Sequence, residues 1–190
     1  MKAKIAAAMC AALLAPCAWA GAPDAKPVPG CAIPAGVSLD KMAVQVGEVA
    51  PRAIEWALGR SREVLEAGRG LDARALALAR KVGVREAAKI RIVVVDRIEL
   101  PSEPMLREAG ARVGLSDSAD GMTLGYAVVV RSGHERNPRL LSHEFRHVAQ
   151  YEACGGIAPF LTTHLAHLAQ HGYEASPFEA DASRHEQREF

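Results

Sequence analysis

The stretch from Leu140 to Tyr151 constrains this chain more than any other, because it places two histidines four residues apart with a glutamate directly after the first. On a helix, residues at this spacing lie one above the other, so His143 and His147 can direct two imidazoles at a single ion. Zinc held by two neutral imidazoles and a third ligand keeps a position open for water, and a neighbouring carboxylate can take the proton of that water as it attacks a carbonyl. We therefore interpret Glu144 as the general base of a hydrolytic zinc site.

The residues around this motif favour a helix. Asn137 and Pro138 suit the N-cap and the first turn, and Leu141, Phe145 and Val148 recur at the spacing of a stripe that faces a core. A motif of five residues also arises by chance, so the competing interpretation is a surface or core helix that carries two unrelated histidines.

A site of this type needs a third protein ligand, and the candidates follow the predicted helix. The longer zinc motif with a third histidine is absent, because Gln150 and Ala153 occupy the positions of its glycine and its last histidine. The candidates are Glu174, Glu179, Asp181 and the histidines that follow the motif. A glutamate is the first choice, and Glu179 competes with Glu174. Glu179 has a second interpretation, since Ser176 three residues earlier would form a capping box with it at the start of the last predicted helix.

Three further histidines share one stripe of the helix predicted after the Gly-Gly pair at 155–156: His164, His167 and His171. We expect this stripe to be a solvated polar face. The alternatives are a second metal site, a pH-sensitive surface, or the completion of the first site by one of these residues.

The first 20 residues have the features of a secretory signal peptide: a start with two lysines, an apolar run, and Ala-Trp-Ala at 18–20. We expect cleavage after Ala20 and a periplasmic or secreted protein, with no stable membrane span once the signal is removed, because the apolar run is too short to serve as one. Lipoprotein processing at Cys17 is the alternative, and Pro16 disfavours it because a small residue is needed at that position.

Residues 21–38 contain several prolines and predict an extended arm, and residues 39–190 have a length that suits one domain. Cleavage would remove two lysines and no acidic residue, which lowers the formal net charge from +1 to −1. A chain with this balance has no electrostatic attraction for nucleic acid.

Two of the four cysteines would leave with the signal peptide. The remaining pair, Cys31 and Cys154, predicts one disulfide in an oxidising compartment, which would tie the arm to the end of the metal helix. Two free buried thiols are the alternative.

The remaining patterns predict a small α+β domain. Helical periodicity recurs between Leu39 and Gly83, and the β-branched run Ile90–Val95 predicts a largely buried strand. A short helix at Met105–Ala111 and a second strand at Thr123–Arg131 follow. We expect a few-stranded sheet on the N-terminal helices, the active-site helix beneath it, and a helical C-terminal part that closes the site.

The run from His143 to Gln150, with Tyr173 and Pro177-Phe178-Glu179 and Ala182 after it, resembles a family of bacterial zincin-like proteins that have an HExxHxxQ helix and a later NPFExEA-type segment. The resemblance covers roughly the last third of the chain. It implies a glutamate-liganded zincin in which His143, His147 and Glu179 hold zinc and Glu144 is the general base.

The resemblance also gives roles to two other residues. Tyr173 would donate a hydrogen bond to the oxyanion, with a packing role as the alternative, and Asp181 would orient a ligand histidine. Ser176 and Asp181 stand where the family commonly has Asn and Glu, and neither change removes a proposed ligand.

Together these features predict an exported, zinc-dependent peptidase that acts on a peptide or protein substrate. The alternative is a non-catalytic periplasmic zinc-binding or interaction protein on the same fold, to which the histidine stripe contributes. A third possibility is a structural domain that holds no metal.

Overall fold

The computed structural model describes residues 31, 47, 49–112, 115–172 and 176–190. The predicted signal peptide (1–20) and the predicted arm (21–38), apart from Cys31, lie outside these residues. Tyr173 and Glu174 also lie outside them.

The fold is α+β, as predicted, and its centre is a sheet in the order β1-β2-β4-β3. β2 (Arg91–Val95) runs parallel to β4 (Ala127–Arg131), whereas β3 (Gly121–Leu124) is antiparallel to β4 and forms one edge. The short β1 (Arg69–Gly70) forms the other edge. The strand predicted at Ile90–Val95 is confirmed apart from its first residue, but the expectation that it is largely buried is wrong, because within β2 only Ile92 is buried and Val94 is exposed.

The single strand predicted at Thr123–Arg131 is wrong, because the chain reverses in its middle. Gly125 has a φ of +68°, which glycine adopts without strain, and it forms with Tyr126 the turn that joins β3 to β4. Apolar residues on both sides of the turn produced the pattern of one continuous strand. The hairpin places Gly121 and Thr123 on the edge strand, beside the helix that carries the zinc motif.

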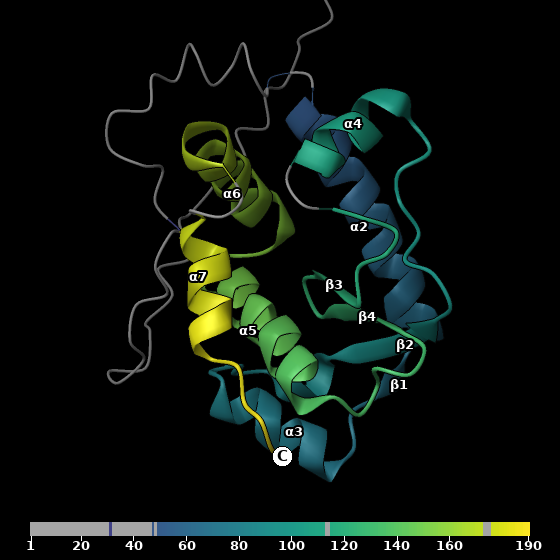
Figure 1. Cartoon of the computed structure of the whole chain (residues 1–190), viewed down its shortest axis with the longest axis vertical. Helices are drawn as coiled ribbons and strands as arrows, with labels where there is room; N and C mark the ends of the chain where they lie inside the picture. The colour runs from purple at the N-terminus through teal and green to yellow at the C-terminus, as the bar shows by residue number, and fades with distance from the viewer. Residues whose placement is uncertain (1–30, 32–46, 48, 113–114, 173–175) are drawn as a thin grey trace, which may run out of the picture.

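Helices cover both faces of the sheet (Figure 1). α2 (Val49–Ala67) packs on one face, and α3 (Ala73–Lys81) and α5 (Pro138–Cys154) pack on the other. The short 3-10 helix η1 (Ala87–Lys89) connects α3 to β2. β4 is buried on both sides because its residues alternate between the two cores: Ala127 and Val129 face α2, and Val128 and Val130 face α3 and α5.

α5 has the ends and the core face that its sequence predicts. The side chain of Asn137 accepts hydrogen bonds from the first turn, Pro138 begins the helix, and Gly155 ends it in the left-handed conformation with a φ of +88°. The predicted core stripe is buried against the sheet and α3: Leu141, Phe145 and Val148.

The C-terminal part consists of α6 (Ile157–His171) and α7 (Pro177–Arg184), and α4 (Pro104–Arg112) lies beside α2. Figure 1 shows α7 lying along α5. A third hydrophobic core joins α5, α6 and α7 through Tyr151, Phe160 and Phe178. The predicted disulfide between Cys31 and Cys154 packs against this core, with its Cα atoms 5.1 Å apart. No helix in the described part of the chain is long and apolar enough to cross a membrane.

A buried ion pair fastens α7 to α5. The guanidinium of Arg146 donates from Nε to Asp181 Oδ2 over 2.7 Å and from Nη2 to Oδ1 over 3.3 Å, and its Nη1 donates to the Val82 carbonyl. Both side chains are less than a tenth exposed. Hydrogen bonds to both partners offset the cost of removing the two charges from water.

We predict that Asp181→Ala lowers the free energy of unfolding by about 3 to 5 kcal/mol, because it leaves the Arg146 charge buried without its partner. Chemical denaturation monitored by circular dichroism measures this change. Glu63→Ala is the control, since its pair with Arg60 is exposed and should contribute less than about 1 kcal/mol. Equal effects of the two substitutions would contradict the structural role of the buried pair.

Candidate metal centre

The structure brings His143, His147 and Glu179 together. One donor atom from each lies within 4.8 Å of the others. The two Nε2 atoms are 3.1 Å apart, and the Glu179 oxygens lie 3.5 Å from His143 Nε2 and 3.6 Å from His147 Nε2. A tetrahedral zinc ion with bonds of about 2.0 to 2.1 Å separates its ligand atoms by about 3.3 Å. The donor types and their spacing therefore fit zinc.

Gln150 fixes the orientation of the His147 ring. Its Nε2 donates to the Phe178 carbonyl over 2.9 Å and to Asp181 Oδ2 over 3.0 Å, which leaves Oε1 as the acceptor that faces His147 Nδ1 at 2.8 Å. The Nδ1 atom must then carry the proton, and the Nε2 lone pair is directed at the site. Gln150 is fully buried, so water does not compete for these hydrogen bonds.

A carboxylate supports His143 in the same way. Glu186 Oε1 lies 3.3 Å from His143 Nδ1, on the side of the ring opposite to Glu179. Glu186 is itself held by the guanidinium of Arg139, one turn before His143 on α5. Both histidines thus present Nε2 to the site and use Nδ1 to contact a neighbouring acceptor.

Glu179 lies in the first turn of α7, where the helix dipole favours a negative charge. Burial raises the pKa of its carboxyl group, but the hydrogen bond from His143 and the charges of the nearby imidazoles outweigh burial and hold that pKa at about 2. The competing capping interpretation loses support, because the Ser176 side chain makes no hydrogen bond to the start of α7 and contacts His164 instead.

Glu144 is held against the edge strand β3. Thr123 Oγ1 donates to Glu144 Oε2 over 2.7 Å and also contacts the Glu144 carbonyl oxygen. The other carboxylate oxygen faces Gly121, where an added Cβ would come within 2.5 Å of Oε1. Only a residue without a side chain leaves room for the Glu144 carboxylate in this position.

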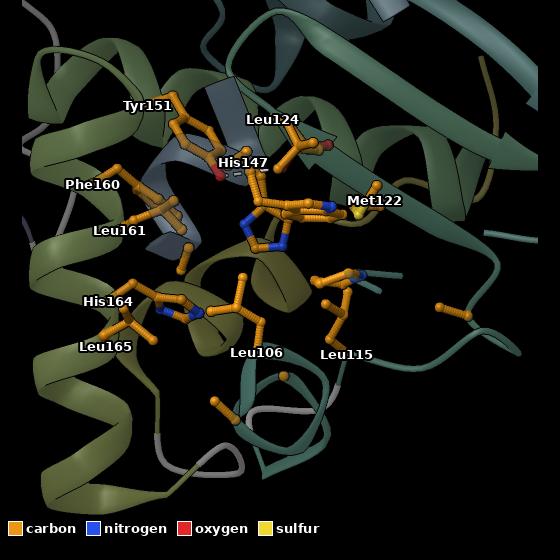
Figure 2. Close-up of a pocket in the computed structure, with 18 of the residues that line it drawn as sticks. Leu106, Leu115, Met122, Leu124, His147, Tyr151, Phe160, Leu161, His164 and Leu165 are labelled. Carbon is orange, nitrogen blue, oxygen red and sulfur yellow. Dashed lines mark hydrogen bonds between the residues drawn. The ribbon is translucent and has the colours of Figure 1, made fainter. Parts of the chain in front are cut away.

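The ligand group and Glu144 line one cavity of about 260 Å³. Figure 2 shows His147 at its centre, Tyr151 and Leu124 on one side, and His164 on α6 facing inward. Tyr151 is not a free donor toward the site, because its hydroxyl group donates to the Thr123 carbonyl over 3.1 Å.

The expectation that the later histidines form a solvated face is wrong. His164 is half-buried on the cavity wall, where its ring stacks on Phe160, and His167 is only 8 % exposed. Packing of α6 against the third core removes these rings from water, which sequence spacing alone cannot reveal. The side chain of His171 lies outside the described residues. Neither His164 nor His167 belongs to the metal-binding group found among the described residues.

The expected role of Asp181 also needs correction. Its carboxylate contacts Arg146 and Gln150 and reaches the ligand His147 only through the amide of Gln150. Tyr173 and Glu174 lie outside the described residues, so Glu179 is the candidate acidic ligand that the structure places beside the histidines.

The sequence did not single out four residues that support the site: Gly121, Thr123, Gln150 as a hydrogen-bonding residue, and Glu186. Gly121 and Thr123 were hidden because the hairpin was interpreted as one strand. Glu186 contacts a residue 43 positions earlier, and no local pattern marks such a contact. Gln150 belongs to the sequence motif, and its position three residues after His147 could have indicated that the two side chains share a helix face.

Comparisons of this chain with models of known protein families, with curated proteins and with solved structures found no match.

The geometry predicts that the pKa values of two histidines in the metal-free protein are shifted in opposite directions. Burial lowers the pKa of His143, but Glu179, Glu144 and Glu186 outweigh burial and raise it above 6.5, whereas burial lowers the pKa of His164 to about 4. NMR spectra of the ring protons as a function of pH, in the presence of a chelator, measure both values. Glu179→Gln should lower the pKa of His143. Identical titration of the two rings would contradict the arrangement.

Proposed function

We propose that this protein is an exported, zinc-dependent peptidase. One observation carries the proposal: His143, His147 and Glu179 converge on one point of a cavity whose wall also holds the carboxylate of Glu144. Two imidazoles, one carboxylate and a neighbouring second carboxylate are the groups that hydrolysis of a peptide bond at a zinc centre requires. The resemblance of the motif to zincin-like proteins supports the same proposal.

A bound zinc ion would supply a Lewis acid that acidifies water and polarises a carbonyl group. The contacts of each proposed ligand orient it or keep it in the protonation state that zinc binding needs. His147 is held with its proton on Nδ1 by Gln150, and His143 faces Glu186 with the same ring atom. The low pKa of Glu179 keeps its carboxylate charged.

Glu144 is the proposed general base. Its Oε2 accepts the hydrogen bond of Thr123, so Oε1 is the atom that takes the proton of the attacking water. The oxygen of the water forms the new bond to the carbonyl carbon, the C–N bond breaks, and Glu144 passes the proton to the departing amine. We keep Tyr173 as the proposed donor to the carbonyl oxygen.

We further propose that the protein works in the periplasm or outside the cell, after removal of residues 1–20. The disulfide between Cys31 and Cys154 supports this, because such bonds persist in oxidising compartments.

We predict about one zinc ion per chain in the purified protein, lost in His143→Ala, and elemental mass spectrometry measures both. His134→Ala is the matched control, because His134 contacts Asp120 on the surface and takes no part in the ligand group. Absence of zinc from the wild-type protein after reconstitution would refute the metal centre.

We predict that Glu144→Gln abolishes peptide hydrolysis and leaves the zinc content unchanged, because the amide keeps the size of the carboxylate but accepts no proton. Cleavage of a mixed peptide library followed by mass spectrometry measures activity. This variant separates the peptidase from a non-catalytic zinc protein, whose biological role would survive the substitution. Full activity of Glu144→Gln with bound zinc would exclude the proposed base.

A further inference from the structure

The cavity extends well beyond the metal-binding group. It continues between α2, α4, α6 and β3, and Figure 2 shows Leu161 and Leu165 on one wall with Leu106 and Leu115 on another. Apolar side chains that remain partly exposed line this extension: Val49, Ala53, Trp56, Ala109, Leu115, Ala119, Leu161 and Leu165.

Most polar groups of the cavity belong to the metal-binding group and its neighbours, and His164 lies on the α6 wall between Leu161 and Leu165. Among the described residues that line it, the ionisable side chains near neutral pH belong to the ligand group, Glu144 and His164. The hydroxyl groups of Thr123 and Tyr151 are already engaged in hydrogen bonds. A charged group in the extension would find no ionisable partner other than His164 among the described residues and would lose its hydration there.

The size of the cavity suits one large side chain. The whole cavity, including the part beside the metal-binding group, has a volume of about 260 Å³. An engineered cavity of about 150 Å³ with aliphatic and aromatic walls is dry and binds benzene, so the space here admits an aromatic ring. Small residues on two facing helices keep this space open, namely Ala53 on α2 and Ala109 with Gly110 on α4.

We infer that this cavity is a specificity pocket that receives an uncharged apolar side chain of the substrate, of the size of Leu, Met or Phe, next to the bond that is cut. The inference rests on the proposed peptidase function, and it names the class of peptide that the site accepts. An acidic side chain is disfavoured twice, because it would lose water and would approach the carboxylates of Glu144 and Glu179.

Binding of N-acetyl amino acid hydroxamates to the zinc-loaded protein tests this inference without turnover. The hydroxamate occupies the metal, and the Leu, Phe, Gly and Asp derivatives differ only in the side chain offered to the pocket. We expect the Leu and Phe compounds to bind at least about tenfold more tightly than the Gly compound in calorimetry, and the Asp compound to bind most weakly. Equal binding of the Leu, Gly and Asp compounds would overturn the pocket.

Ala53→Phe places a ring in the cavity and should remove the preference for Leu and Phe over Gly, with zinc content unchanged. Leu58→Phe is the matched control on the same helix, since Leu58 is 43 % exposed and does not line the cavity. Leu165→Asn on the opposite wall keeps the shape of leucine and adds a polar group. It should reduce the same preference, and it provides the test if Ala53→Phe does not fold.

The outcomes separate the two proposals. Zinc binding and peptide hydrolysis without any preference among the hydroxamates would leave the peptidase intact and overturn the specificity pocket. Absence of zinc would overturn both proposals, because no metal-bound group would then hold the apolar side chain of a substrate at the cavity. A preference for Leu and Phe that survives both Ala53→Phe and Leu165→Asn would place the specificity elsewhere and overturn the pocket.

Discussion

The buried contact between Arg146 and Asp181 sets the geometry of the candidate site, because it positions α7 on α5. A charge pair at this depth is stable only when its remaining donors and acceptors are satisfied. Here the Val82 carbonyl and the Gln150 amide satisfy them. Since α7 carries Glu179 two residues before Asp181, the same contact brings the carboxylate to the two histidines. The carboxylate proposed as the acidic ligand is thus positioned by an ion pair in which Glu179 itself takes no part.

Different faces of α5 pack against the sheet and line the candidate site. The stripe of Leu141, Phe145 and Val148 is buried in the core, and His143 and His147 lie on a face directed at the cavity. Glu144 lies between these faces and meets the edge strand. The contact of its Oε1 with Gly121 therefore follows from the close packing of α5 on β3, and it explains why a glycine begins that strand.

Local patterns predicted the parts of this structure that depend on neighbouring residues. The spacing of His143 and His147, the cap at Asn137 and the β-branched run at Arg91–Val95 each express helix or strand geometry within a few positions. Where tertiary packing decides, the sequence was insufficient. The turn at Gly125 was hidden within an apolar run, and the His164 ring is half-buried against Phe178, which lies on α7. The ion pair between Arg146 and Asp181, 35 positions apart, leaves no periodic signal at all.

The placement of polar groups within an apolar cavity connects the chemistry of the site with its selectivity. Apolar walls lower the effective dielectric constant around the carboxylates of Glu179 and Glu144, so their charges are less screened than charges on an open surface. In the proposed zinc site, two neutral imidazoles and one carboxylate would leave part of the charge of a divalent ion uncancelled, and that remaining charge would polarise a carbonyl group. The same walls that strengthen this electrostatic effect give no partner to a charged substrate side chain. The proposed catalysis and the proposed preference for apolar residues would therefore share one physical origin, the apolar side chains that the described parts of α2, α4 and α6, apart from His164, present to the cavity.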